Sequence, residues 1–193
     1  MQDTSSDLEL ARQAAQGDEA SFRRIYESTC DRLFSLLRYQ VGDRDHARDL
    51  LQDTYVQAWK RIGDYRGEAP LTAWLRMIAI RKAIDWKRSA LLRLKRTVEI
   101  HERTAAVEPD HRGLQFDSEK ATFERALQKL SPMQRGALLL REWEEWDFAA
   151  IAETLGCKES TARVHHTRAR EKMRELLRHV PSVRAESLKG QIV

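Results

Sequence analysis

Apolar side chains recur at helical spacing along most of the chain, and no alternation of apolar and polar residues continues far enough for a strand. The first clear run follows Asp18, a candidate N-cap, and stops at Gly42-Asp43. Its apolar positions are Phe22, Ile25, Tyr26, Leu33, Leu37 and Val41. The pattern predicts a long amphipathic helix, preceded by a shorter one from Leu8 to Gln16, in an all-α protein.

Two more helices are predicted in the first half of the chain. Asp43 is the candidate cap of the first, whose apolar side comprises Ala47, Leu51, Tyr55, Ala58, Trp59 and Ile62. Its opposite side carries the polar residues Asp49, Gln52, Asp53 and Gln57. After the turn-like sequence GDYRGEAP, an apolar stripe predicts a helix from Leu71 to Arg88.

The middle of the chain lacks this periodicity. The sequence KRSALLRLKR holds five cations and no acid, and the polar stretch after it contains Pro109 and Gly113. We therefore predict two small helical domains, at residues 8–90 and 118–180, joined by a flexible linker at 91–117. The tail at 181–193 is expected to be disordered.

Helical periodicity resumes in the second domain. It is carried by Phe123, Leu127 and Leu130, and by Ala137 to Trp143 after a cap-then-proline start at Ser131-Pro132. Farther on, Asp147 can cap a short helix and Gly156 can take a left-handed turn. A basic helix follows from about Glu159 to His179, so the order predicts a helix-turn-helix.

Composition and charge limit the possible partners of the protein and its cellular compartment. With 34 Lys and Arg against 30 Asp and Glu, the net charge is only +4 and the pI about 9.2, so an anionic partner depends on clustered cations. No apolar segment follows a basic start, and no run approaches the roughly 18 apolar residues of a membrane span. The distant Cys30 and Cys157 agree with a reduced compartment. We expect a cytoplasmic protein that is not inserted in a membrane.

The helix-turn-helix admits two interpretations, a DNA-reading module and an ordinary helical hairpin. The predicted buried edge of its second helix is Ala162, Val164 or His165, Ala169, Met173 and Leu176. The side chains that then project outward are Arg163, Thr167, Arg168 and Arg170. Arg is the usual bidentate reader of guanine, and Thr can meet a thymine methyl or a phosphate, which favours DNA binding.

The adjacent His165 and His166 raise the question of a metal site. Neighbouring residues lie roughly 100° apart on a helix, so one ion could hardly take both. Cys157 precedes the helix, where a free cysteine behaves as a small buried hydrophobe. No nucleophile or acid stands at motif spacing, so we expect no metal, no cofactor and no catalytic residue.

Asp49 and Asp53 stand four residues apart on the polar side of their helix, a pairing that is mildly unfavourable in an isolated helix. The residues alone leave two interpretations open, a solvated acidic face and a docking surface for a partner. Magnesium or acid–base chemistry lacks support, because no Gly-rich phosphate loop or further ligand set accompanies the pair.

The segment from Leu71 to Arg96 is strongly basic, with Asp85 as its single acid. Its cations are Arg76, Arg81, Lys82, Lys87, Arg88, Arg93, Lys95 and Arg96. Trp74 lies in the apolar stripe and is expected in the core, whereas Tyr65 and Trp86 are freer to stack on bases. Cations interleaved with such rings are typical of a surface for single-stranded nucleic acid.

Four motifs in this order resemble those of a known family. They are RDLLQDTYVQAWKRI, YRGEAPLTAWLRMIAIRKAIDWKR, LSPMQRGALLLREWEEWDFAAIAETLG and STARVHHTRAREKM, with a polar linker after the second. Over roughly residues 8–178 the chain resembles the bacterial extracytoplasmic-function (group IV) sigma factors. The resemblance implies an alternative sigma factor, not an enzyme, that binds core RNA polymerase, directs it to promoters and is controlled by an anti-sigma factor.

The resemblance also implies a role for each candidate surface. The helix that docks on the polymerase clamp is matched by Asp49, Gln52, Asp53 and Trp59. The element that melts and reads the single-stranded minus-10 region is matched by Tyr65, Arg66, Gly67, Trp74, Arg76, Arg81, Lys82, Lys87 and Arg88. The module that reads duplex minus-35 DNA is matched by Lys158, Ser160, Thr161, Arg163, Val164, His165, Thr167 and Arg168. Lys158 stands where a Ser or Pro is usual.

Two rival interpretations of the same residues differ in class. A stand-alone helix-turn-helix regulator would bind a palindromic site as a dimer, but it leaves the acidic face and the basic, Trp-rich helix unexplained. A metal-dependent nucleic-acid enzyme would use the two histidines with Asp49 and Asp53. Footprinting without polymerase tests the first, and metal analysis with an EDTA-controlled nuclease assay tests the second.

Overall fold

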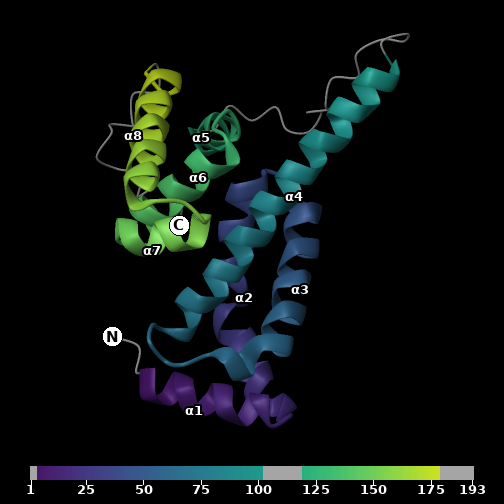
Figure 1. The fold of residues 1–193 in the computed structure, drawn as a ribbon, viewed down its shortest axis with the longest axis vertical. Helices are drawn as coiled ribbons and strands as arrows, with labels where there is room; N and C mark the ends of the chain where they lie inside the picture. The colour runs from purple at the N-terminus through teal and green to yellow at the C-terminus, as the bar shows by residue number, and fades with distance from the viewer. Residues whose placement is uncertain (1–3, 102–118, 179–193) are drawn as a thin grey trace.

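The computed structural model describes residues 4–101 and 119–178 of the 193-residue chain. All regular elements within those ranges are helical, which confirms the predicted all-α fold. The first half is a bundle of α1 (Thr4–Ala15), α2 (Glu19–Val41), α3 (Arg44–Arg61) and α4 (Leu71–His101), with a 3-10 turn at Ile62–Asp64. The long helices α2, α3 and α4 lie side by side, and α1 crosses one end of them (Figure 1).

The second half is a smaller group of helices. It consists of α5 (Glu119–Gln128), α6 (Pro132–Leu138), a π-helical turn at Leu139–Trp143, α7 (Phe148–Leu155) and α8 (Glu159–Leu176). The recognition-helix candidate α8 packs mainly on α6 and α7. The short helix α7 is followed by a turn and then by the longer α8, which confirms the predicted helix-turn-helix.

The predicted caps are confirmed by local hydrogen bonds. The Asp18 carboxylate accepts two backbone N–H groups at the start of α2, and Gly42 ends that helix with a φ of 83°. Ser131 forms a reciprocal capping box at the start of α6. Asp147 caps α7, and Gly156 takes the left-handed conformation, φ 65°, that separates α7 from α8.

Helix α4 is longer than the predicted range of Leu71 to Arg88, because it continues to His101. Residues 91–101, assigned to the linker from the sequence, are therefore helical. The stretch from Ser89 to Arg96 contains no glycine or proline and is rich in Leu, Arg and Lys, which are good helix formers. The rest of the predicted linker and the tail at 181–193 lie outside the described residues.

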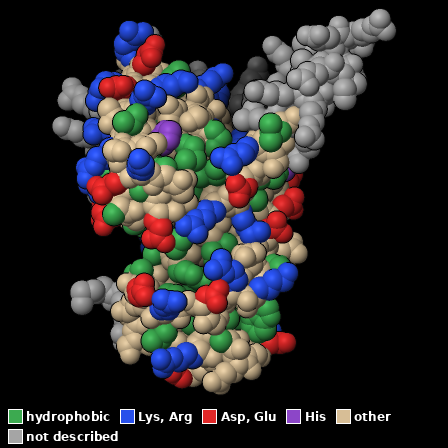
Figure 2. Space-filling view, viewed as in Figure 1, with side chains coloured by type: hydrophobic (Ala, Val, Ile, Leu, Met, Phe, Trp, Pro, Cys, Tyr) green, Lys and Arg blue, Asp and Glu red, His purple; other side chains and the backbone are tan. Residues whose placement is uncertain are grey.

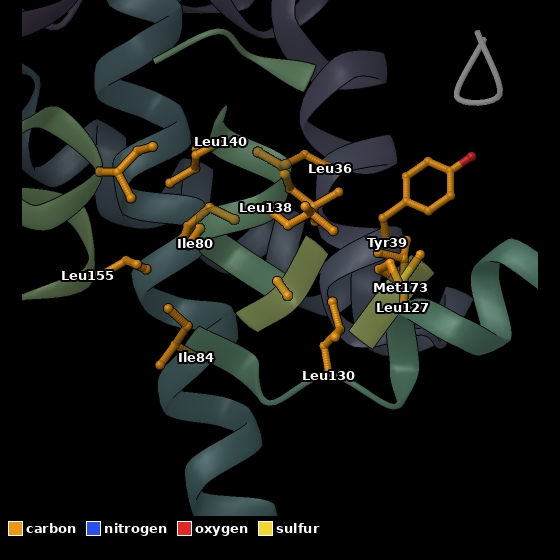
Figure 3. Packing of buried hydrophobic residues seen from close by; sticks show 14 of the residues in the cluster. Leu36, Tyr39, Ile80, Ile84, Leu127, Leu130, Leu138, Leu140, Leu155 and Met173 are labelled. Atoms are coloured by element: carbon orange, nitrogen blue, oxygen red, sulfur yellow. The ribbon is translucent and has the colours of Figure 1, made fainter. Parts of the chain in front are cut away.

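The two halves pack directly against each other, which the prediction of two domains on a flexible linker did not anticipate. Leu36 and Tyr39 of α2, with Ile80 and Ile84 of α4, join the same buried cluster as apolar side chains of the second half (Figure 3). A separate cluster among α1 to α4 forms the core of the first half. Because α2 and α4 bury side chains on two sides, they belong to both cores.

Candidate protein and nucleic-acid interfaces

The outer face of α3 presents three of its four predicted polar residues to solvent, and the fourth, Gln57, is half-buried. Asp49, Gln52 and Asp53 are exposed, and Lys82 Nζ of α4 lies 4.0 Å from Oδ2 of Asp53. The opposite side of α3 is buried through Ala47, Leu50, Thr54, Tyr55 and Ala58. Leu50 and Thr54 thus replace the expected Leu51 and Trp59 in the buried stripe, because the packed side of α3 is rotated by about one residue position.

An apolar groove of about 540 Å³ lies beside this polar face, between α2 and α3. It is lined by Phe22, Tyr26, Arg48, Leu51, Gln52, Tyr55, Val56, Trp59 and Lys60. The Trp59 side chain is 39% exposed, and its ring packs edge-on against Phe22 with centroids 4.8 Å apart. Tyr26 was predicted to be buried but is exposed at the groove. Since Gln52 belongs to both surfaces, one partner can contact the apolar groove and the acidic face together.

The loop before α4 does not present Tyr65 as a free ring. Tyr65 is 8% exposed, its hydroxyl donates to the Ala69 carbonyl at 2.6 Å, and its ring lies 6.0 Å from that of Trp74. Burial raises the pKa of Tyr65 to about 12. The expectation that this ring is free to stack on a base is therefore not met here, whereas Arg66 is exposed and Gly67 has a φ of 74°.

Trp86, the other ring expected to be free, is half-buried and already has neighbours. It packs against the His46 ring, with centroids 4.5 Å apart, and Lys87 Nζ lies 5.6 Å from its ring. Burial, reinforced by the charge of Arg135, lowers the pKa of Lys87 to about 8. Trp74 is half-buried against the core of the first half, as predicted, and Arg88 is exposed.

Two of the four arginines predicted to read minus-10 DNA, Arg76 and Arg81, have hydrogen-bond or ion-pair partners in the second half of the chain, and Arg81 is exposed nonetheless. Arg76 pairs with Glu144 at 2.8 Å, and the two side chains are only 10% and 3% exposed. Arg81 donates to the carbonyls of Glu153 and Thr154 at 2.8 and 3.1 Å. Burial lowers the pKa of Arg76 and raises that of Glu144, and the opposite charge of each partner opposes these shifts.

The recognition-helix candidate α8 holds its predicted DNA-facing residues outward. Arg163, Val164, Thr167 and Arg168 are exposed. Arg163 pairs with Glu159 one turn earlier, and its guanidinium carbon lies 4.5 Å from the centre of the Phe148 ring. Figure 2 shows Lys and Arg side chains over this half of the molecule, with acidic side chains between them.

The two histidines diverge around α8, as the sequence predicted. His166 is 8% exposed, its Nε2 lies 2.7 Å from Oε1 of Glu142, and its ring meets Phe148 edge-on. The buried edge is therefore Ala162, His166, Ala169 and Met173. Val164 and Leu176, which the sequence pattern predicts at the buried edge, are exposed, because the helix orientation that buries Ala162 and Ala169 turns both side chains toward solvent. His165 is half-buried, and burial lowers its pKa.

The start of α8 is open to solvent. Lys158 is its N-cap residue and makes no side-chain capping hydrogen bond. Lys158 and Ser160 are exposed, and Thr161 is half-buried. The first N–H groups of a helix carry partial positive charge, so a lysine there favours a nearby anion such as a phosphate.

Within residues 4–101 and 119–178, no group of three or more His, Cys, Asp or Glu residues could hold a metal ion. Cys157 packs against the second-half core, and burial raises the pKa of its thiol. In the same ranges, no helix has both the length and the apolar content that a bilayer crossing requires.

Sequence reasoning missed the residues that hold the two halves together. Arg135 is 2% exposed and donates to the carbonyls of Gln40, Leu127, Gln128 and Leu130. Burial lowers the pKa of Arg135 to about 10. The available signal was Gly136 inside a predicted helix, since glycine within a helix often marks a close approach of another element.

Family models match both halves of the chain. Sigma-70 region 2 matches residues 25–91, and Sigma-70 region 4 matches residues 120–173. Among curated proteins, the RNA polymerase sigma-H factor of Pseudomonas aeruginosa is 28% identical over 177 residues, covering 86% of this chain and 90% of the relative. The ECF RNA polymerase sigma factor SigM of Mycobacterium tuberculosis is 28% identical, covering 89% of this chain and 85% of the relative.

Two solved structures resemble the whole fold. The sigma factor RpoE of Bartonella quintana, in complex with the anti-sigma factor NepR, is 25% identical with a TM-score of 0.63, covering 82% of this chain and 98% of that one. CnrH in complex with the cytosolic domain of CnrY is 25% identical with a TM-score of 0.61, covering 91% of this chain and 98% of that one.

Proposed function

Because this chain belongs to the extracytoplasmic-function sigma factors of bacterial RNA polymerase, we propose that α3, α4 and α8 carry its three separate binding tasks. As a sigma factor, the protein binds core RNA polymerase and directs promoter-specific initiation of transcription. In the proposed division, α3 binds polymerase, α4 with its preceding loop binds single-stranded minus-10 DNA, and α8 binds duplex minus-35 DNA.

The single observation that carries this division is the exposure of the predicted residues on α3 and α8. Asp49, Gln52 and Asp53 form an acidic face with no role in the first-half core. The neighbouring groove with Trp59 adds apolar contact area, which supplies most of the binding energy at protein interfaces. On α8, exposed Arg168 and Thr167 have the chemistry that reads base edges and phosphates.

These tasks require binding energy alone, so the proposed factor carries out no catalytic step of its own. Melting unpairs and unstacks bases at a cost of a few kcal/mol, which contacts to the separated strand offset. We place the protein in the cytoplasm, where polymerase and promoter are found. Controlled release by an anti-sigma partner is also proposed, since the similar sigma factor RpoE was solved in complex with the anti-sigma factor NepR.

The test of the α3 assignment is the substitution Asp53→Arg. It places a cation in the exposed acidic face, so binding to core polymerase should fall at least tenfold while helical content and unfolding midpoint stay the same. Co-purification and fluorescence anisotropy with core polymerase measure the binding. Glu27→Arg, an equal charge change at an exposed position on α2, is the matched control. Unchanged polymerase affinity in Asp53→Arg would remove α3 from the docking surface.

The anti-sigma proposal has its own test. A two-hybrid screen with the whole chain supplies candidate partners, and each purified candidate is added to transcription reactions that contain core polymerase. A partner that binds the chain and stops transcription supports the proposal. If no binding partner suppresses transcription, control by an anti-sigma factor is rejected.

A further inference from the structure

Two arginines on the face of α4 assigned above to single-stranded DNA have their acceptors in the second half of the same chain: Arg76 is buried there, and Arg81 is hydrogen-bonded there although its residue is exposed. We propose that the second half, through α6, α7 and the turn at Glu144, competes within the molecule with single-stranded nucleic acid for Arg76 and Arg81. The inference rests on the proposed role of α4. It adds that the free sigma factor closes over its own minus-10 surface.

The Arg76–Glu144 pair is the first part of this closure. The side chains come from opposite halves, lie 2.8 Å apart and are almost completely shielded from water. A buried guanidinium needs a charged or strongly polar acceptor, and removing that acceptor is costly. A phosphate can take the place of Glu144 only after the halves separate, since both side chains of the pair are almost completely shielded from solvent.

Arg81 makes the second set of contacts. Its guanidinium donates to the carbonyls of Glu153 and Thr154, at the C-terminal end of α7. The last carbonyls of a helix lack partners within the helix and carry partial negative charge. They therefore satisfy the same arginine donors that phosphate or base oxygens would satisfy on a DNA strand.

An apolar seam beside these arginines is built for close approach. Ile80 and Ile84 of α4 are buried at 0% and 7% exposure. They face Gly136 of α6, where an added Cβ would lie 3.7 Å from Ile80 Cγ2 and from Ile84 Cδ1, and 3.2 Å from Leu155 Cδ2. The two distances to α4 are ordinary van der Waals contacts, and the tighter approach is to Leu155 of α7, so a side chain larger than one methyl group is needed at position 136 to push α6 away from α4.

The end of α2 provides an independent polar seam between the halves. Arg135 of α6 donates to the Gln40 carbonyl, Gln40 Nε2 donates to the Pro132 carbonyl at 2.9 Å, and Gln128 Nε2 donates to the Tyr39 carbonyl at 3.0 Å. Carbonyls at the C-terminus of α2, which water would otherwise satisfy, are thus hydrogen-bonded by the second half. Closure therefore combines a buried ion pair, capped carbonyls and apolar contact.

The competition is tested by opening the closed state in the full-length chain. The native cysteines are first removed by Cys30→Ser and Cys157→Ser, so that only introduced cysteines take a spin label. Labels are then attached at two exposed positions, Arg23→Cys in α2 and Lys172→Cys in α8, and the distance between them reports the separation of the halves. The parent should give one short distance. Glu144→Gln, which leaves Arg76 buried without a charged partner, and Gly136→Leu, which wedges α6 from α4, should both add a longer-distance population.

The same variants are then titrated, without polymerase, with a fluorescent single-stranded oligonucleotide of mixed sequence. Glu144→Gln and Gly136→Leu should each bind it about tenfold more tightly than the parent, and saturating oligonucleotide should move the parent toward the longer distance. Glu171→Gln, an equal charge change at an exposed site on α8, should behave like the parent. Gly136→Ala should have a smaller effect than Gly136→Leu, because only one methyl group enters the seam.

Two results would overturn the inference, and they differ in what else they reject. If both variants keep the short distance, the closed state does not depend on these contacts, and the role of α4 in DNA binding is untouched. If the variants open without gaining oligonucleotide affinity, the covered face does not bind single strands. The added substitution Arg81→Ala in the opened Glu144→Gln variant should abolish the gain, and its failure to do so would reject the proposed role of α4 itself.

Discussion

The two arginine-bearing helices α4 and α8 present their cations in opposite ways. On α8, Arg163 and Arg168 are exposed along a solvent-facing edge. On α4, Arg76 is buried against Glu144, and Arg81 is hydrogen-bonded to the end of α7. Duplex DNA can therefore reach α8 in this conformation, whereas a single strand that approaches α4 finds Arg76 buried and Arg81 already bonded to acceptors of the second half. Similar arginine chemistry is thus accessible to a ligand on one helix and partly occupied on the other, according to what packs against each helix.

We expect the greatest loss of stability from a substitution at Arg135, which joins the second half to the end of α2 through the Gln40 carbonyl and bonds three carbonyls of its own half. Arg135→Ala removes a buried guanidinium that donates to four carbonyls, so those acceptors lose their donor inside the protein. We expect the free energy of unfolding to fall by about 3–5 kcal/mol, since each orphaned buried acceptor costs roughly 1–3 kcal/mol and partial solvation limits the sum. Urea unfolding followed by circular dichroism measures the loss.

The control for Arg135→Ala is Arg174→Ala on the exposed side of α8, which should change stability by less than about 0.5 kcal/mol. Equal losses in the two variants would show that the buried guanidinium contributes no more than a surface arginine.

A smaller effect is expected on the open side of the comparison. Arg168→Ala should weaken binding to a minus-35 duplex by roughly 1–3 kcal/mol, the range for an arginine that reads a base edge, with core polymerase binding unchanged. The measurement is duplex affinity on a promoter selected by in vitro transcription from a genomic library, compared with a scrambled duplex. An equal loss on both duplexes would make Arg168 a phosphate contact.

The smallest change in stability is expected from the ionisation of Lys87, a partly buried lysine of α4. Because the pKa of Lys87 is lowered from 10.5 to about 8 in the folded chain, the folded state holds that proton less tightly than the unfolded state. The resulting destabilisation is present in full below pH 8 and disappears as pH rises from about 8 to 10.5, so stability gains with pH over that window. Lys87→Met should flatten this rise in urea unfolding midpoints, while Arg88→Met, at an exposed neighbour, should leave it intact.

Local structure was predictable because caps and periodicity act over a few residues. Asp18, Ser131, Asp147 and Gly156 mark helix ends in the sequence and in the structure alike. The end of α4 was misplaced for a related reason. The loss of apolar periodicity after Trp86 indicates only that no core face continues, whereas the helix itself needs no core face to extend to His101.

The contacts between the halves were not predictable from these patterns. Glu144 and Arg76 are far apart along the chain, and neither position carries a local signal that names its partner. The choice between neighbouring positions was equally open, since His166 rather than Val164 or His165 faces the core. Periodicity fixes a helical face only to about one residue, or roughly 100°, and long-range packing decides the remainder.

Both halves are parts of one polypeptide, and α4 of the first half extends over 31 residues, or about 46 Å at 1.5 Å per residue (Figure 1). The halves therefore meet at a fixed effective concentration, of the order of millimolar for a short tether, whatever the amount of protein in the cell. The contact between the halves is intramolecular, so neither dilution nor a higher protein concentration changes the fraction of molecules in which Arg76 and Arg81 are bonded to the second half. At a given temperature, pH and ionic strength, the occupancy of the closed state is independent of protein concentration, and a ligand changes it only if its affinities for the open and closed states differ.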